Sequence, residues 1–162
     1  TGIQRSSATP WGAWTTTTPS TAPKNTPKKD IVAIMAAHRI PYAATASVAY
    51  PEDLVRKLEK AASIRGSKFV HILSPCPSGW KSEPAATVKI ARLAVQSRIF
   101  PLYEVEDGER YTVTVHPRPA PVIEYLRLQG RFNHLTLEQI EHIQRDADRA
   151  WAQLLARAGC DA

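Results

Sequence analysis

The pattern of apolar and polar residues from position 30 onward predicts alternating helices and strands. Asp30 suits a helix N-cap, and the apolar spacing that follows it predicts an amphipathic helix. The residues expected on its packed face are Ile31, Ile34, Met35 and His38. Residues 42–50 form a short, apolar and uncharged stretch, which is typical of a strand covered on both faces in a parallel sheet.

A β-α-β unit is predicted from this strand onward. Pro51 suits the first turn of a helix, and Gly66 suits its end. The buried stripe expected for this helix consists of Leu54, Leu58, Ala61 and Ala62. Residues 68–73 predict the second strand, joined to the first by a right-handed crossover. A third helix is expected from about residue 83 to residue 98.

The next segment changes to the period of strands. Residues 102–115 alternate in polarity around Asp107 and Gly108, which together predict a type I′ hairpin and a small two-stranded ribbon. Residues 116–121 are a proline-rich extended linker, and residues 122–129 predict a short helix.

Both ends of the chain depart from this alternation. Residues 1–14 combine glycine, proline and small hydroxyl residues, which favours a loop, and residues 15–29 contain three prolines and few apolar residues, which predicts an extended surface segment. Near the other end, Thr136 and Gln139 fit a capping box for a final helix. Its packed face is expected to contain Ile140, Ile143, Ala147, Trp151 and Leu154. The predicted fold class is therefore α/β with a β-hairpin and a helical C-terminal tail.

Composition narrows the possible classes of protein. A chain of 162 residues with 43% hydrophobic content can bury one core. It lacks both a stretch of roughly 20 apolar residues and the pattern of a secretion signal, so we expect a cytoplasmic protein with no membrane association. The net charge of +6 suits an anionic cofactor or an acidic protein partner. Because its basic residues are not interleaved with aromatic ones, we expect no nucleic-acid binding.

Cys76 is the candidate for chemistry that the residues themselves suggest. It lies in the loop at 74–80, directly after the second predicted strand, and ligands of α/β sheets bind beyond the carboxyl ends of strands. The chain has only two cysteines, so no disulfide framework is expected, and a structural thiol remains the alternative for Cys76. The sequence contains no P-loop, C-x-x-C or H-E-x-x-H motif, which leaves kinase and zinc-enzyme hypotheses without support.

Four motifs and a fifth segment occur in a fixed order along the chain. They are T-G-I-Q-R-S-S-A-T-P at 1–10, G-A-W-T-T-T-T-P at 12–19, I-P-Y-A-A-T-A-S-V-A-Y-P-E-D at 40–53, S-P-C-P-S-G-W at 74–80 and L-Q-G-R-F at 128–132. In these motifs the chain resembles the thiamine-diphosphate-binding (beta) subunit of 2-oxoacid:ferredoxin oxidoreductases, of the pyruvate type. The resemblance implies that residues 1–100 form the C-terminal half of a thiamine-diphosphate-binding doubly wound domain. Residues 101–162 would then serve subunit contact.

The resemblance also implies the site residues. Thr1, Gly2 and Gln4 would lie beside thiamine diphosphate, in a cofactor-edge loop at 1–14, and Cys76 would be one ligand of a [4Fe-4S] cluster. The Mg²⁺-binding segment and the other three cysteines would come from the N-terminal half of the beta subunit. The alternative for the opening loop is a turn whose polar groups satisfy its own backbone. No catalytic residue is assigned.

The implied activity is oxidative decarboxylation of pyruvate to acetyl-coenzyme A. Coenzyme A is the co-substrate, electrons pass through [4Fe-4S] clusters to ferredoxin, and the partners are the alpha, gamma and delta subunits. The isolated chain is expected to be inactive. Two alternatives remain: a non-catalytic assembly or ferredoxin-docking module, and the same chemistry on a branched-chain or aromatic 2-oxoacid.

Overall fold

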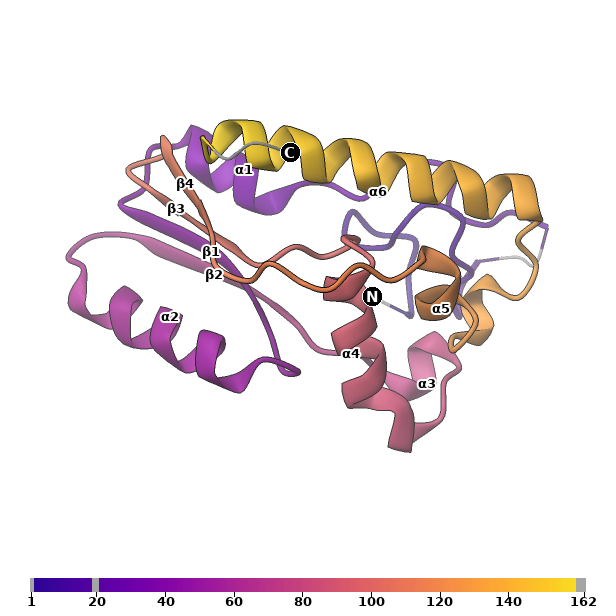
Figure 1. Cartoon of the computed structure of the whole chain (residues 1–162). Coiled ribbons are helices and arrows are strands. Elements are labelled where there is room, and N and C mark those ends of the chain that lie inside the picture. The colour runs from indigo at the N-terminus through magenta and orange to yellow at the C-terminus, as the bar shows by residue number, and fades with distance from the viewer. Residues whose placement is uncertain (1, 19–20, 160–162) are drawn as a thin grey trace.

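The computed structural model describes residues 2–18 and 21–159, and in this part of the chain a four-stranded sheet lies between helices (Figure 1). In chain order the elements are α1 (Ile31–Ala37), β1 (Tyr42–Ser47), α2 (Pro51–Ser63), β2 (Lys68–Leu73), α3 (Pro77–Trp80), η1 (Pro84–Ala86), α4 (Thr87–Gln96), β3 (Tyr103–Glu106), β4 (Arg110–Val113), α5 (Val122–Leu126), η2 (Gly130–Phe132) and α6 (Leu137–Arg157). Helix α2 covers one face of the sheet, whereas α1 and α6 lie on the other. This arrangement confirms the predicted α/β class.

Strand β1 occupies the interior of the sheet, whose strand order is β2-β1-β3-β4. All six of its residues are buried, as predicted for a strand covered on both faces. It pairs in parallel with β2 and antiparallel with β3. The strand ends at Ser47 rather than at residue 50, because the chain turns there and the Tyr50 N–H donates to the Ser47 carbonyl at 3.0 Å.

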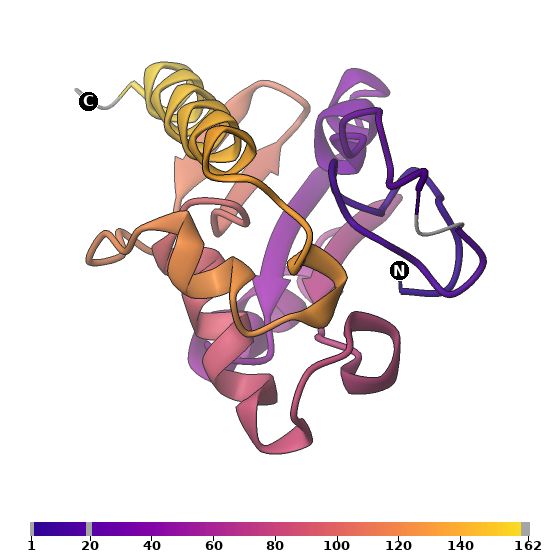
Figure 2. The same cartoon turned by 90° about the vertical axis from the view of Figure 1, so that its right-hand side faces the viewer.

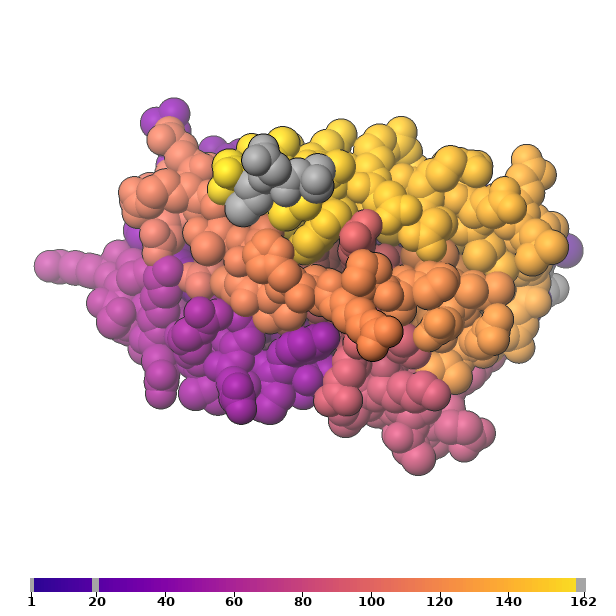
Figure 3. Space-filling model, in the orientation of Figure 1, coloured from indigo at the N-terminus to yellow at the C-terminus, as the bar shows by residue number. Residues whose placement is uncertain are grey.

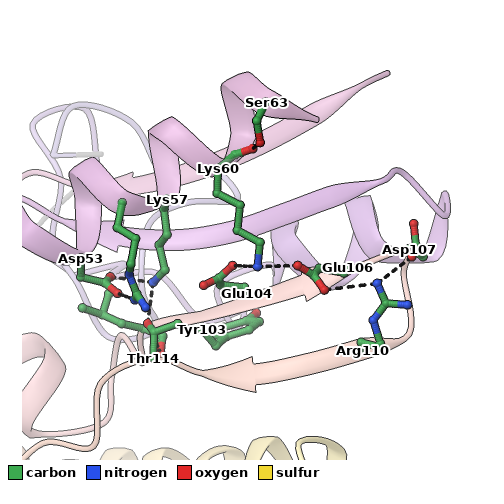
Figure 4. A network of polar contacts seen from close by, with 12 residues as sticks. Asp53, Lys57, Lys60, Ser63, Tyr103, Glu104, Glu106, Asp107, Arg110 and Thr114 are labelled. Atoms are coloured by element: carbon green, nitrogen blue, oxygen red, sulfur yellow. Dashed lines mark hydrogen bonds and ion pairs between the residues drawn. The ribbon is translucent and has the colours of Figure 1, made fainter. Parts of the chain in front are cut away.

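Helix α2 faces the sheet with a side that the hydrophobic pattern did not predict. Its buried residues are Asp53, Lys57 and Ala61, whereas Leu58 is 44% exposed and Ala62 is exposed. The charged residues are tolerated because they are paired, as Figure 4 shows. The Lys57 Nζ donates to the Asp53 carboxylate at 2.6 Å, to the Thr45 carbonyl at 2.8 Å and to the Thr114 hydroxyl at 2.7 Å. The predicted stripe was therefore wrong at Leu58 and Ala62 and correct at Ala61.

The predicted hairpin exists, but it is part of the main sheet rather than a separate ribbon. Asp107 and Gly108 have φ values of 53° and 76°, as a type I′ turn requires. Strand β3 pairs with β1 on one side and with β4 on the other. Val105, at the centre of β3, is consequently fully buried.

Two other helices differ from their predicted form. Asp30 caps α1 as expected, accepting a hydrogen bond from the Ala33 N–H at 3.0 Å. The helix nevertheless buries Val32 and Ala36, and it leaves Ile34 41% exposed, because the sheet lies on the neighbouring side of the helix. The third predicted helix is divided into η1 and α4, since the proline at position 84 starts a separate turn.

The C-terminal part agrees closely with its sequence pattern. Thr136 and Gln139 form the predicted capping box, and α6 buries Ala147, Trp151 and Leu154. Helix α6 extends along one side of the molecule, beside the β3–β4 hairpin (Figure 3). Seen along the long axis, the opening segment, α3 and the segment between α5 and α6 gather beyond one end of the sheet (Figure 2).

The segment after the opening loop is irregular, as predicted, but it is not simply solvent-exposed. Lys24 is 4% exposed, and its Nζ donates to the Thr9 carbonyl at 2.7 Å. Its backbone pairs with Gly12 and Ala13 through hydrogen bonds of 2.7 and 3.1 Å. This correction means that residues 21–29 fasten the opening loop to the domain.

Within the described residues, none of the helices is both long and apolar enough to span a bilayer.

Candidate functional site

The loop that presents Cys76 follows β2 directly. Because β2 is parallel to β1, this loop leaves the same edge of the sheet as the carboxyl end of β1. Pro75 is buried and Cys76 is exposed with a free thiol. The short helix α3 then begins, and the Trp80 N–H donates to the Cys76 carbonyl at 2.8 Å. Cys76 is therefore exposed, on a loop whose backbone is hydrogen-bonded to the start of α3. The alternative interpretation, a structural thiol, would favour a buried position.

The opening loop contacts the Cys76 loop through two glycines. A Cβ atom placed on Gly2 would lie 2.3 Å from the backbone of Gly79, so neither position accommodates a side chain without displacement. A Cβ atom placed on Gly79 would lie 3.4 Å from the Cys76 Sγ. The thiol therefore lies at the edge of the contact between the two loops that the resemblance placed beside the cofactor.

The threonine run fixes the opening residues in this position. The Thr16 N–H donates to the Gly2 carbonyl at 3.0 Å, and the Thr17 N–H donates to the Ile3 carbonyl at 3.0 Å. The two threonine hydroxyls donate to the same carbonyls at 3.2 and 2.9 Å. The hydroxyl-rich composition thus satisfies backbone groups in a segment that has no strand partner.

The segment 128–132 contacts both the residue that follows α3 and the opening loop. The Gly130 N–H donates to the Lys81 carbonyl at 2.9 Å, and the Trp14 N–H donates to the Arg131 carbonyl at the same distance. The Arg131 guanidinium lies 3.8 Å from the ring centroid of Trp80. Motifs from four separate parts of the chain therefore meet at the Cys76 loop.

Arg131 is a charged residue in this site that sequence reasoning missed. Its side chain is buried, at 2% exposure, and it donates to the Gln129 Oε1 at 2.9 and 2.7 Å and to the Tyr125 hydroxyl at 3.3 Å. Burial lowers the pKa of the Arg131 guanidinium, whereas Tyr125 and Cys76 raise it. A single arginine between glycine and phenylalanine forms no periodic pattern, so only the resemblance of the segment 128–132 drew attention to this region.

The predicted cofactor residues differ in their surroundings. Gly2 is buried, and Gln4 is exposed while its carbonyl accepts hydrogen bonds from the Ser6 N–H at 2.9 Å and the Thr9 hydroxyl at 2.8 Å. Thr1 lies outside the described residues. The structure therefore brings Gly2 to the Cys76 loop and places Gln4 in a turn further along the opening loop.

Side chains of the kinds that bind metals are not gathered around Cys76 in the part of the chain that the structure describes. In residues 2–18 and 21–159, no group of three or more His, Cys, Asp or Glu side chains is arranged to hold a metal ion. A cluster bound at Cys76 would need its remaining ligands from another part of the enzyme.

A separate cavity of about 370 Å³ lies between the sheet and α6. Its lining includes Lys28, His71 and Phe100 but none of Gly2, Cys76 and Arg131. Burial is the main cause that lowers the pKa values of Lys28 and His71. The cavity nevertheless borders the site at the Cys76 loop, because its lining includes Tyr125, whose hydroxyl accepts a hydrogen bond from Arg131.

Comparison with known proteins identifies relatives that match nearly the whole sequence of this chain. No family model matches the chain. The chain is 50% identical over 159 residues to the ketoisovalerate oxidoreductase subunit VorB of Pyrococcus abyssi, covering 95% of this chain and 51% of VorB. It is 53% identical over 152 residues to the pyruvate synthase subunit PorB of Methanocaldococcus jannaschii, covering 91% of this chain and 51% of PorB. It is also 43% identical over 177 residues to PorB of Pyrococcus furiosus, covering 95% of this chain and 54% of that subunit.

These relatives are subunits of oxidoreductases that act on 2-oxoacids. Over nearly all of its length the chain is homologous to VorB and PorB, the beta subunits of 2-oxoacid:ferredoxin oxidoreductases, which confirms the resemblance drawn from its motifs. The chain spans about half the length of the curated relatives it matches.

Proposed function

We propose that the chain is part of the thiamine-diphosphate subunit of a 2-oxoacid:ferredoxin oxidoreductase and that Cys76 is its ligand to a [4Fe-4S] cluster. The observation that carries this proposal is that four of the five ordered segments, those at 1–10, 12–19, 74–80 and 128–132, lie together at the loop of one exposed thiol. The homology to VorB and PorB supports the class of enzyme.

The residues around Cys76 fit a thiolate-bound cluster. Thiolates are the usual ligands of such clusters, and Cys76 has an exposed sulfur that no disulfide occupies. The flanking Pro75 and Pro77 restrict the backbone that presents this sulfur. The three other thiolates are proposed to come from the N-terminal half of the subunit.

The opening loop fits the edge of a diphosphate-bearing cofactor. Gly2 is held against Gly79 by the threonine run, and we assign Thr1, Gly2 and Gln4 to the surroundings of thiamine diphosphate and its Mg²⁺ ion. When bound, thiamine diphosphate supplies the carbanion that adds to the 2-oxoacid, and the cluster carries single electrons. The chain's own residues position these groups and exclude water between the two loops.

An exposed apolar surface on α2 and β2 is the basis for the proposed contact with a partner. Val55 and Leu58 of α2 are 51% and 44% exposed, and Ile72 of the neighbouring strand β2 is 42% exposed. Strand β2 is at the edge of the sheet, so one side of its backbone has no partner strand among the described residues. We propose that the N-terminal half of the subunit covers this apolar flank, and that the alpha, gamma and delta subunits and ferredoxin complete the assembly.

Labelling of introduced thiols tests the proposed contact of α2. In the assembled enzyme, a thiol introduced by Leu58→Cys is expected to react at least about tenfold more slowly with an alkylating reagent than one introduced by Ser63→Cys, because covered thiols lack access. Ser63 is exposed on another side of the same helix, which makes it the matched control. Peptide-resolved mass spectrometry measures both rates, and equal rates would remove the proposed contact.

Substrate choice is tested by turnover of the assembled enzyme purified without oxygen. Identity to PorB and to VorB is nearly equal, at 53% and 50%, so it does not separate pyruvate from 2-oxoisovalerate. We propose pyruvate and expect its kcat/KM for ferredoxin reduction in the presence of coenzyme A to exceed those of 2-oxoisovalerate and phenylglyoxylate by at least about tenfold. A preference for 2-oxoisovalerate or phenylglyoxylate would overturn the choice of pyruvate and leave the proposed class of enzyme intact. Absence of turnover with all three would contradict the proposed function.

A further inference from the structure

Arg131 carries a buried charge whose hydrogen bonds, within the described residues, go to neutral groups. The atoms that accept its hydrogen bonds belong to the Gln129 amide and the Tyr125 hydroxyl. Among the ion pairs of the described residues, none involves Arg131, although its side chain is 2% exposed. A guanidinium buried without an anion is costly, and a negative charge nearby would add to the stabilisation that the ring faces of Trp80 and Phe132 supply.

The geometry directs this charge toward the Cys76 loop. The guanidinium lies 3.8 Å from the ring centroid of Trp80, and Trp80 is hydrogen-bonded through its backbone to Cys76 at 2.8 Å. The electrostatic interaction between Cys76 and Arg131 is favourable when the sulfur is a thiolate, and it raises the pKa of Arg131. Tyr125, which is hydrogen-bonded to the guanidinium, raises the pKa of Arg131 as well.

We propose that Arg131 is the counter-charge of the iron–sulfur cluster at Cys76 and that its guanidinium raises the reduction potential of that cluster. The inference rests on the proposed function, since it requires a cluster at Cys76. One-electron reduction adds one negative charge to a cluster, and a fixed cation in a low-dielectric site stabilises the more negative state. Arg131 is not a ligand of the iron and acts on the cluster through its charge alone.

The test is a redox titration of the assembled enzyme with dithionite, followed by electron paramagnetic resonance. At the wild-type midpoint, Arg131→Gln is expected to lower the ratio of reduced to oxidised cluster about tenfold, which corresponds to a shift of about 59 mV toward negative potential. Arg131→Lys should retain most of the wild-type potential because it retains the charge. Arg127→Gln is the matched control, since Arg127 is exposed four residues earlier and its charge is screened by solvent.

A second variant keeps the arginine in place. Gln129→Glu puts a carboxylate at the position that accepts two Arg131 hydrogen bonds, so it should shift the potential in the same direction without removing the guanidinium. Wild-type potentials in both Arg131→Gln and Gln129→Glu would overturn the inference, and so would an equal shift in Arg131→Lys and Arg131→Gln. If Cys76→Ser leaves the cluster unchanged, the proposed function itself fails. If Cys76→Ser removes the cluster and the potentials do not move, only the role of Arg131 fails.

Discussion

Replacing Lys57 with alanine is expected to lower the free energy of unfolding by about 3–5 kcal/mol, because it leaves a buried carboxylate without its principal partner. The Lys57 side chain is 0% exposed and the Asp53 side chain is 7% exposed. Two of the three hydrogen bonds of the Lys57 Nζ connect α2 to β1 and to the segment after β4, and the third pairs it with Asp53 in the same helix. Figure 4 shows the bonds to Asp53 and Thr114. Denaturant unfolding of the full subunit, followed by circular dichroism, measures the loss.

Arg56 provides the control for this prediction. It also pairs with Asp53, at 2.6 Å, but its side chain is 58% exposed. Exposed ion pairs contribute little, so Arg56→Ala is expected to cost less than about 1 kcal/mol. Similar losses in Arg56→Ala and Lys57→Ala would show that burial of the Lys57 pair does not determine its contribution.

The sequence predicted the existence of most elements more accurately than their orientation. The apolar spacing of Leu54 and Leu58 correctly indicated a helix, but Leu58 faces away from the sheet in the described fold. Periodicity shows that a helix has an apolar side, and it does not show which neighbour covers that side. Burial of Lys57 depends on Asp53 in the same helix and also on Thr45 and Thr114, which lie outside the helix and accept its other two hydrogen bonds.

The hairpin also shows that a local feature was predicted from the sequence whereas its long-range pairing was not. Asp107 and Gly108 determine their turn locally, so that part was predicted. The pairing of β3 with β1 depends on residues such as Ala43 and Val105, which are far apart in the chain. Nothing in the alternation of β3 identifies its partner, and the ribbon was therefore predicted as separate.

At the candidate site, the resemblance identified loops but not their contacts. Cys76 was named from its position after a predicted strand and Gly2 from the resemblance, and the structure adds the direct contact between the Gly2 and Gly79 backbones. The position of Arg131 over Trp80 arises from packing between residues on separate segments. Such a stacked, buried cation leaves no periodic signal, which explains why sequence reasoning assigned it no role.

Iron–sulfur spectroscopy of a Cys76→Ser variant tests the central claim most directly. In the assembled enzyme purified without oxygen, the variant is expected to lose the signal of one reduced [4Fe-4S] cluster, because serine does not replace a thiolate ligand of the cluster. Cys160→Ser, which removes the other cysteine of the chain, should retain that signal. A Cys76→Ser enzyme with the full wild-type signal and iron content would contradict cluster binding at this loop and would leave the chain with a docking role alone.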